Sequence, residues 1–357
     1  MVRPLDVAVG LYGHYESIDE VKHYYGLLAI YGLARTADAA GDDDLWARCE
    51  KILRRFPDEI DHPTYNFPSY TIGGISQAYL LATGRMGDRA HLVREYADEM
   101  MRAPRDPSGI VIMPREPESN KIWIDAAMAT TLYLLYAGLA LAERSYVDEA
   151  VRQAVLMYDE LLDPDAGLLH QCKNVVGPGL YSQDHWGRGN GWGYLALAEL
   201  VAALPADSPH RAGVVERFRA LSAALLAHQS ERGLWRQEIP DDHSYEESSG
   251  TGLILYGIGL GMRHDALDPA RYAEPFRHGV AGLAGICINP DFSTEFSCPG
   301  CLAPGEGKDK GTVKAYMTLR LPYLDERHSF GPLILALTEA HRHGITDVRL
   351  RNRPHAL

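Results

Sequence analysis

The segment from residue 184 to 192 (DHWGRGNGW) combines residue types that suit recognition of an acidic sugar. Tryptophan faces stack well on the C–H surfaces of sugars, and Trp186 and Trp192 bracket the segment. Between them Arg188 carries a planar fork of donors that matches a carboxylate. The intervening glycines allow backbone to approach a ligand closely. The alternative is a glycine-rich helix entry in which both tryptophans only pack the core.

Asp125 is the second candidate for chemistry. It lies in an otherwise apolar run, 120–128 (NKIWIDAAM), beside Trp123. A carboxyl group there must be hydrogen-bonded, paired or protonated. Desolvation raises its pKa, which makes it a usable proton donor near neutral pH. The alternative is a residue in the first turn of a helix, stabilised by the helix dipole.

Two further side chains are weaker candidates. His170 lies in a segment before the tryptophans (GLLHQ, 167–171), where a lone histidine is more often a surface residue. Tyr24 and Tyr25 lie on the first long helix, and we expect at least one, with Tyr25 preferred, to face a cavity. The segment 246–251 (EESSGT) is better explained as a helix cap than as a site.

The sequence gives no reason to expect a metal or cofactor. Cys298 and Cys301 form a lone C-x-x-C pair, without the second pair or the two histidines that a structural zinc site requires. No βαβ context supports a redox role for that pair. There is also no P-loop, dinucleotide fingerprint, nucleophile elbow or HExxH motif.

Composition narrows the class of protein. The chain has 357 residues, with 35 Lys and Arg against 48 Asp and Glu, for a formal net charge of −13. It has no basic stripe of the kind that nucleic-acid binders carry, so we expect no nucleic-acid partner. It also has no apolar run long enough to span a bilayer, and no signal-like apolar stretch at its start. Its odd number of scattered cysteines favours reduced thiols and a cytoplasmic location.

The elements that must position these residues are helices of two alternating kinds. Long helices that are apolar nearly all round are expected at about 18–40, 71–84, 122–145, 189–204, 248–263 and 328–343. More charged helices follow at about 43–55, 89–102, 147–162, 209–230 and 269–286. An inner ring of buried helices inside an outer ring requires this alternation, so the pattern predicts an all-α toroid. An open solenoid or an irregular bundle remains an alternative.

The links between the helix pairs favour the toroid. Segments 103–121, 163–188, 231–247 and 287–327 are long and irregular, and they lead from outer into inner helices. Long loops in compact domains are usually functional, and these should meet at one mouth of the ring. Nothing resembling a linker divides the chain, so we expect one domain over residues 1–357.

The motifs together resemble a known family. Trp123, Asp125 and Met128, then GLLH at 167–170, WGRGNGW at 186–192 and a late Gly-Pro helix occur in the order typical of the unsaturated glycuronyl hydrolases. These are glycoside hydrolase families 88 and 105, including the unsaturated rhamnogalacturonyl hydrolases. The resemblance covers about residues 20–343 and implies an (α/α)6 barrel.

The resemblance also implies a substrate and a reaction. The substrate is an oligosaccharide left by a polysaccharide lyase and ending in a 4,5-unsaturated uronic acid. An aspartate, here Asp125, protonates the C4=C5 vinyl ether and activates water, and the resulting hemiketal opens and expels the aglycone. Two-carboxylate displacement at the anomeric carbon is not used. The positions that match the sugar subsite are His170, Trp186, Arg188 and Trp192, with Trp123 beside them.

One departure from the family pattern concerns the opposite wall. The family usually has a second aspartate near the start of the second inner helix, whereas segment 66–73 here reads NFPSYTIG. Ser69 or Thr71 stands where that acid is expected. The alternatives therefore stay open: an ordinary glycosidase, epimerase or lyase on the same barrel, or a non-catalytic carbohydrate-binding protein.

Overall fold

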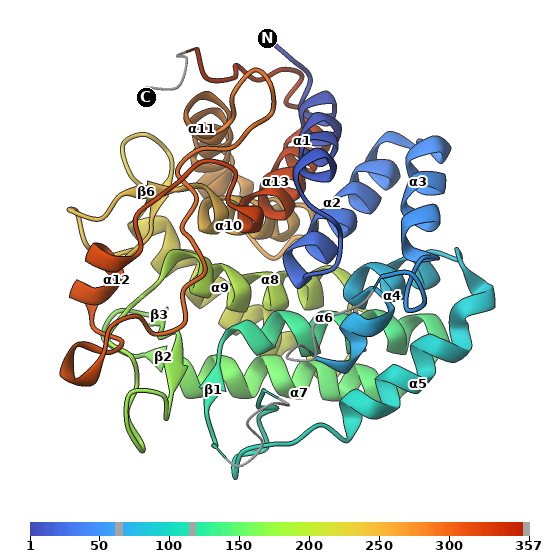
Figure 1. Cartoon of the computed structure of the whole chain (residues 1–357), viewed down its shortest axis with the longest axis horizontal. Coiled ribbons are helices and arrows are strands. Elements are labelled where there is room, and N and C mark those ends of the chain that lie inside the picture. Colours follow the sequence, from blue (N-terminus) through green and yellow to red (C-terminus); the bar gives the residue numbers. More distant parts are fainter. Residues whose placement is uncertain (61–66, 114–118, 353–357) are drawn as a thin grey trace.

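The computed structural model describes residues 1–60, 67–113 and 119–352. Its centre is a ring of six helices in which each packs on the next and the last packs on the first (Figure 1). In ring order these helices are α2 (Tyr24–Ala40), α4 (Gly74–Ala82), α6 (Asp125–Leu141), α8 (Gly187–Ala203), α10 (Ser248–Arg263) and α13 (Phe330–Arg342). The protein is therefore an (α/α)6 barrel, and the prediction of an all-α toroid is confirmed.

A second layer of helices covers the ring. The outer helices are α1 (Pro4–Ile18), α3 (Asp43–Leu53), α5 (Ala90–Met101), α7 (Arg144–Leu161), α9 (Arg211–Ala227) and α11 (Pro269–Cys287). Hydrophobic patterning explains the two layers, because α10 is buried along almost its whole length whereas α3 and α5 bury only a few residues. One hydrophobic cluster joins both layers from Val7 to Val348.

Helix α1 was not expected from the sequence. It packs against α13 and α2, and so it supplies the outer partner of the sixth pair. The first inner helix begins at Tyr24 rather than near residue 18, because the chain turns extended at Asp19, where α1 ends. Val2 and Val348 form an antiparallel bridge that joins the segment before α1 to the segment after α13.

A buried polar hub ties four inner helices together inside the ring. Glu199 on α8 accepts hydrogen bonds from three tyrosine hydroxyls at 2.5 to 2.6 Å: Tyr31 of α2, Tyr136 of α6 and Tyr256 of α10. Arg35 of α2 donates to the same carboxylate at 3.4 Å. Because a buried carboxylate without such partners is strongly unfavourable, the hub fixes the helices around it.

The links between pairs carry the few strands of the described residues. Strand β1 (Ile122–Trp123) pairs with β4 (Cys172–Lys173), β2 (Leu162–Asp163) with β3 (Leu168–Leu169), and β5 (Trp235–Arg236) with β6 (Glu246–Glu247). The remaining helical turns are α12 (Val313–Leu319) and the 3₁₀ helices η1 (Pro68–Ile72), η2 (Gly87–Arg89), η3 (Gly307–Asp309) and η4 (Arg327–Ser329). Bonds such as Gln183 N–H to the Gly311 carbonyl connect different links to one another.

Across the described residues, no helix combines the length and the apolar character that a membrane crossing requires.

Candidate active site

A cavity of about 500 Å³ lies where inner helices begin and the links meet. Its described lining is mostly aromatic and apolar, with three charged side chains, Asp125, Arg188 and Arg320. The other lining residues are Tyr24, Phe67, Tyr70, Met113, Trp123, Met128, Trp186, Trp192, Gly300, Cys301 and Leu302. A cavity of this size and character suits one or two sugar rings.

Asp125 is the one carboxyl group among the described residues of this lining. It opens α6, and burial raises its pKa from 3.8 to about 6, against the opposing effects of Arg188 and Trp192. Its Oδ2 atom and the indole nitrogen of Trp192 are both buried without a well-aligned hydrogen-bonding partner. Asp125 is thus suited to hold and deliver a proton near neutral pH.

The tryptophan segment forms another part of the wall, although its side chains are deeply set. Trp186 and Trp192 are each only 1% exposed, and Trp192 belongs to the main hydrophobic core. Trp186 and Trp192 therefore pack inside the protein and also line the cavity. Trp123 is half-buried and exposes more of its side chain.

Gly187 of this segment and Gly250 of α10 pack closely against the protein itself. A Cβ on Gly187 would lie 2.5 Å from the Arg236 carbonyl oxygen, and one on Gly250 would lie 2.5 Å from the Gly187 backbone. Glycine therefore lets the starts of α8 and α10 meet backbone to backbone, rather than making room for a ligand as we expected.

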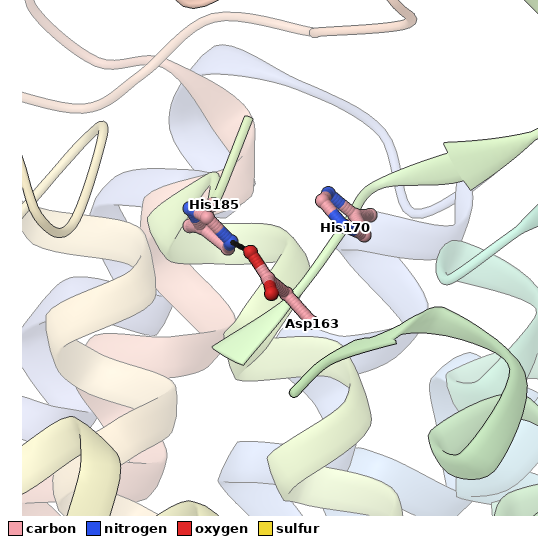
Figure 2. Close-up of side chains that lie close together, drawn as sticks. All are labelled: Asp163, His170 and His185. Carbon is pink, nitrogen blue, oxygen red and sulfur yellow. Dashed lines mark hydrogen bonds and ion pairs between the residues drawn. The ribbon is translucent and has the colours of Figure 1, made fainter. Parts of the chain in front are cut away.

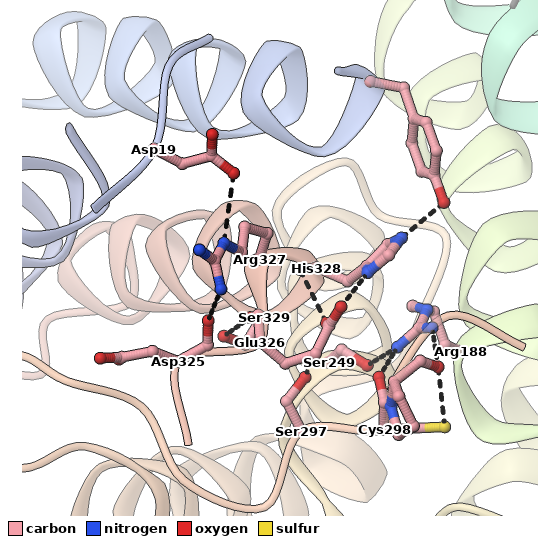
Figure 3. Close-up of polar contacts among 12 residues, drawn as sticks. Asp19, Arg188, Ser249, Ser297, Cys298, Asp325, Glu326, Arg327, His328 and Ser329 are labelled. Atoms are coloured by element: carbon pink, nitrogen blue, oxygen red, sulfur yellow. Dashed lines mark hydrogen bonds and ion pairs between the residues drawn. The ribbon is translucent and has the colours of Figure 1, made fainter. Parts of the chain in front are cut away.

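Arg188 is largely committed to the protein. Its guanidinium donates to Ser249 Oγ at 3.0 Å and to the carbonyls of Cys298 and Pro299 at 2.5 and 2.7 Å (Figure 3). It also stacks over the Trp186 ring at 4.6 Å and is 1% exposed. Arg188 thus braces the link that carries Cys298, and has few donors left for a substrate carboxylate.

Arg320 is less committed than Arg188, whose Nε atom is also buried and unpartnered but whose two terminal guanidinium nitrogens are both engaged. It follows α12, lines the cavity, and makes no side-chain hydrogen bond or ion pair with the described residues. Its Nε atom is buried and unpartnered. No pattern in the sequence pointed to Arg320, because it lies in an irregular link far from the motifs.

Two predicted subsite residues do not line the cavity. Tyr24 occupies the wall in place of Tyr25, whose ring packs instead on Tyr24 and on His328. His170 is stacked between Tyr181 and His185. Its neighbour Gln171 proves important, because its side chain bonds the Cys301 carbonyl, the Ala303 N–H and the Tyr316 hydroxyl.

His170 belongs to a cluster with the ligand set of a metal site. Ligand atoms of Asp163, His170 and His185 all lie within 4.8 Å of one another (Figure 2). Two histidines and a carboxylate suit a divalent transition metal. However, His185 Nε2 already bonds Asp163 Oδ2 at 3.0 Å and its ring stacks on His170, so these contacts account for the cluster without a metal.

Cys301 lines the cavity, and Cys298 lies beside it against Trp186. Both are free and buried, and they cluster with Trp186 and Tyr316. The positive charge of Arg188 and a bond from Cys301 lower the pKa of the Cys298 thiol against the opposing effect of burial. No further histidine or acid of the described chain completes a metal-binding group around them.

The wall where a second aspartate was expected is aromatic. Ser69 is fully buried, and its hydroxyl has no partner among the described residues. Thr71 interacts with Tyr96. Tyr70, between them, is the residue of η1 that enters the cavity, where its hydroxyl contacts Met128 Sδ at 3.7 Å. Asn66, in the same segment, lies outside the described residues.

Comparison with known proteins identifies the family to which these site residues belong. Residues 12–343 match Glycosyl Hydrolase Family 88. The chain belongs to this family. It is therefore a glycoside hydrolase, and the resemblance seen in its motifs is confirmed.

Individual relatives agree with the family. The chain is 26% identical to the unsaturated rhamnogalacturonyl hydrolase YesR of Bacillus subtilis, over 65% of this chain and 69% of that protein. It is 23% identical to an unsaturated 3S-rhamnoglycuronyl hydrolase of an Alteromonas strain, over 71% of this chain and 64% of that protein. A crystal structure from Salmonella enterica, described as a possible member of the GH105 family, superposes with a TM-score of 0.78 at 25% identity, covering 90% and 83% of the two chains.

Proposed function

We propose that the protein releases a terminal 4,5-unsaturated uronic acid from lyase-generated oligosaccharides by hydrating the C4=C5 double bond. The observation that carries the proposal is Asp125, a carboxyl group whose pKa burial raises to about 6, in an aromatic cavity of sugar size. The names of the two curated relatives support the substrate class.

The proposed chemistry uses Asp125 as an acid. Its carboxyl proton passes to C4, the electron pair of the double bond forms the new C–H bond, and water adds to C5. The product is a hemiketal, which opens to a ketone and frees the anomeric carbon to expel the aglycone. A proton donor positioned at the reacting carbon typically contributes 10²- to 10⁴-fold to such a step.

Recognition of the uronate is divided among several side chains. Arg320, with free donors, meets the substrate carboxylate, a contact for which Arg188 has little capacity left. Trp123, Trp186 and Trp192 bound the ring. Tyr25 and His170 support residues of the cavity wall without lining it. Tyr25 packs on His328, and His170 packs on His185, next to Trp186.

An ordinary glycosidase on this barrel is less well supported. Inverting enzymes place a second carboxylate about 6.5 to 9.5 Å from the acid, and retaining enzymes about 5 to 5.5 Å from it. Among the described lining residues Asp125 has no such partner. A non-catalytic binding role would leave a buried, protonatable carboxyl group without a use.

Loss of the conjugated double bond tests the proposal directly. Purified protein is mixed with unsaturated disaccharides from several lyases, and ultraviolet absorbance at the lyase-product band is followed. We expect absorbance to fall, and Asp125→Asn to slow the fall by 10²-fold or more. Consumption of saturated oligosaccharides only, or an unchanged rate in Asp125→Asn, would refute it.

We further propose that the chain acts as one catalytic domain in a reducing, cytoplasmic compartment. The single hydrophobic cluster from Val7 to Val348 supports the first point, and five unpaired cysteines support the second.

A further inference from the structure

A hydrogen-bonded chain leads from the cavity into the protein. The hydroxyl of Tyr24, a lining residue on α2, lies 2.5 Å from His328 Nε2. His328 Nδ1 lies 2.6 Å from Glu326 Oε1, and its backbone N–H donates to Oε2 of the same carboxylate at 2.9 Å (Figure 3). His328 and Glu326 are only 7% and 4% exposed, so water competes little for these bonds.

The protonation states determine which group donates in each of these hydrogen bonds. Burial lowers the pKa of His328, which is therefore neutral at pH 7. The nearby His328 and Arg188 hold the pKa of Glu326 below its ordinary value, so it is a carboxylate. A neutral imidazole beside a carboxylate donates from Nδ1 and keeps Nε2 as an acceptor. The Tyr24 hydroxyl therefore donates to His328, as in a nucleophile–base–orienter arrangement.

Three neighbouring groups act on the pKa of His328. Glu326, on the same turn, raises its pKa, whereas Arg188 of α8 and His23, just before α2, lower it. Glu247, just before α10, raises the pKa of Arg188.

The remaining neighbours place little net charge near His328. Tyr24 and Tyr25 contribute ring contacts, and Arg327 on the same turn is paired with Asp19.

Tyr24 and Asp125 line the same cavity from two different inner helices. Tyr24 belongs to α2 and Asp125 belongs to α6, with α4 between them in the ring. Tyr70, at the start of that intervening wall, stacks with the Tyr24 ring at 6.3 Å and interacts with the charges of both Tyr24 and Asp125. The aspartate expected in that wall is absent from positions 69 and 71.

We propose that Tyr24, positioned by His328 and Glu326, is the second proton-transfer group of the active site, taking the proton of the attacking water. This inference rests on the proposed function, because it assigns a base to that same reaction. Tyr24 is the catalytic residue, and His328 and Glu326 are positioning residues that act through it.

The proton movements balance over the cycle. As Asp125 protonates C4, water bonds to C5 and passes a proton to the Tyr24 oxygen, whose own proton moves to His328 Nε2. The carboxylate of Glu326 stabilises the imidazolium. When the hemiketal opens, its hydroxyl proton returns to Asp125, and the proton on His328 returns through Tyr24 to the ring oxygen released from C5. Both groups regain their starting states.

The pH profile of kcat/KM on an unsaturated disaccharide tests this proton relay, formed by Tyr24, His328 and Glu326. We expect a bell-shaped profile. As pH increases, kcat/KM should first rise as His328 loses its proton and then fall as Asp125 ionises. Tyr24→Phe and His328→Gln should lower kcat by 10²- to 10⁴-fold with KM changed only a few-fold, and should abolish the rising limb. Glu326→Gln removes the charge that raises the pKa of His328, so its rising limb should move to lower pH while the falling limb stays.

A matched control perturbs the same turn away from the cavity. His14 Nε2 bonds the carboxylate of Asp325, the neighbour of Glu326, at 3.0 Å, so His14→Gln should keep the wild-type profile. A Tyr24→Phe enzyme with wild-type kcat, or a His328→Gln enzyme that keeps the rising limb, would overturn the relay.

Nitrogen-15 NMR of the wild-type histidines gives a test that needs no variant. We expect His328 to be neutral with its proton on Nδ1 at pH 7.5, and an imidazolium or the other tautomer would overturn the relay. The two proposals fail separately: wild-type protein that consumes no unsaturated substrate refutes the proposed function, whereas active protein with unaltered variants refutes only the relay.

Discussion

Replacing Asp125 by asparagine should make the folded protein more stable at neutral pH while it destroys activity. Burial raises the pKa of this carboxyl from 3.8 to about 6, so the folded state prefers the protonated form. Above pH 6 the ionised carboxylate costs stability, and the cost disappears as pH falls below the unfolded pKa. A neutral amide avoids the cost altogether.

The size of the effect follows from the two pKa values. A tenfold change in proton affinity corresponds to about 1.4 kcal/mol, so the shift bounds the gain at roughly 3 kcal/mol. Asp125 is partly exposed to the cavity, and solvent there reduces the gain to about 1–2 kcal/mol. With an unfolding entropy of roughly 2 cal/mol/K per residue, the Tm should rise by about 1–3 °C.

Thermal unfolding followed by circular dichroism at pH 7.5 and pH 4 measures this. The Tm difference between Asp125→Asn and wild type should be positive at pH 7.5 and shrink towards zero at pH 4. Asp163→Asn is the matched control, because its hydrogen bonds, including that from His185, lower its pKa, and the variant should lose stability at pH 7.5. Equal Tm values for wild type and Asp125→Asn at both pH values would show that Asp125 is not desolvated.

Three other substitutions address recognition and the scaffold. Arg320→Met should raise KM for an unsaturated uronate by about tenfold or more, because a charge-assisted hydrogen bond contributes roughly 1.5–3 kcal/mol; steady-state kinetics should show a smaller change with the uronate methyl ester. Glu199→Ala should destabilise the protein by about 3–5 kcal/mol in denaturant unfolding, because it strands Arg35 and three tyrosine hydroxyls. Gly250→Ala should cost about 1–3 kcal/mol in the same assay and raise KM, because its Cβ would meet the Gly187 backbone at 2.5 Å.

The sequence was a good guide to the barrel because hydrophobic periodicity reports burial directly. Helix α10 begins and ends where its pattern predicts, at 248 and 263. Helix α1 was missed because it carries buried and polar residues in a short amphipathic stretch that did not stand out from a terminal segment. The start of α2 was misplaced because the predicted helix was extended back over residues 19–23 (DEVKH), a mostly polar stretch in which the chain is not helical.

The site was less predictable, because motifs identify residue types but not their directions. Asp125 and Trp186 lie in the cavity wall, as expected. Neighbouring residues on a helix point about 100° apart, so a one-residue difference places Tyr24 rather than Tyr25 in the cavity. Arg320 comes from a link whose path depends on tertiary contacts such as those of Gln171, and no local pattern encodes such contacts.

The two ends of the ring interior differ in how well their polar atoms are satisfied. In the hub, both oxygens of Glu199 and all three tyrosine hydroxyls have partners, although Arg35 Nε is buried without one among the described residues. At the cavity, four atoms of lining residues are buried without a well-aligned partner in the described chain: Asp125 Oδ2, Trp192 Nε1, Arg188 Nε and Arg320 Nε. Each such atom costs about 1–3 kcal/mol in a folded protein, and natural structures keep few of them away from functional sites. A ligand that bonds them relieves this cost on binding, so a product-like uronate should raise the Tm in proportion to its occupancy. Because Arg320→Met removes one of the unpaired donors, it should diminish that rise, whereas Glu199→Ala should lower the starting Tm and leave the rise intact.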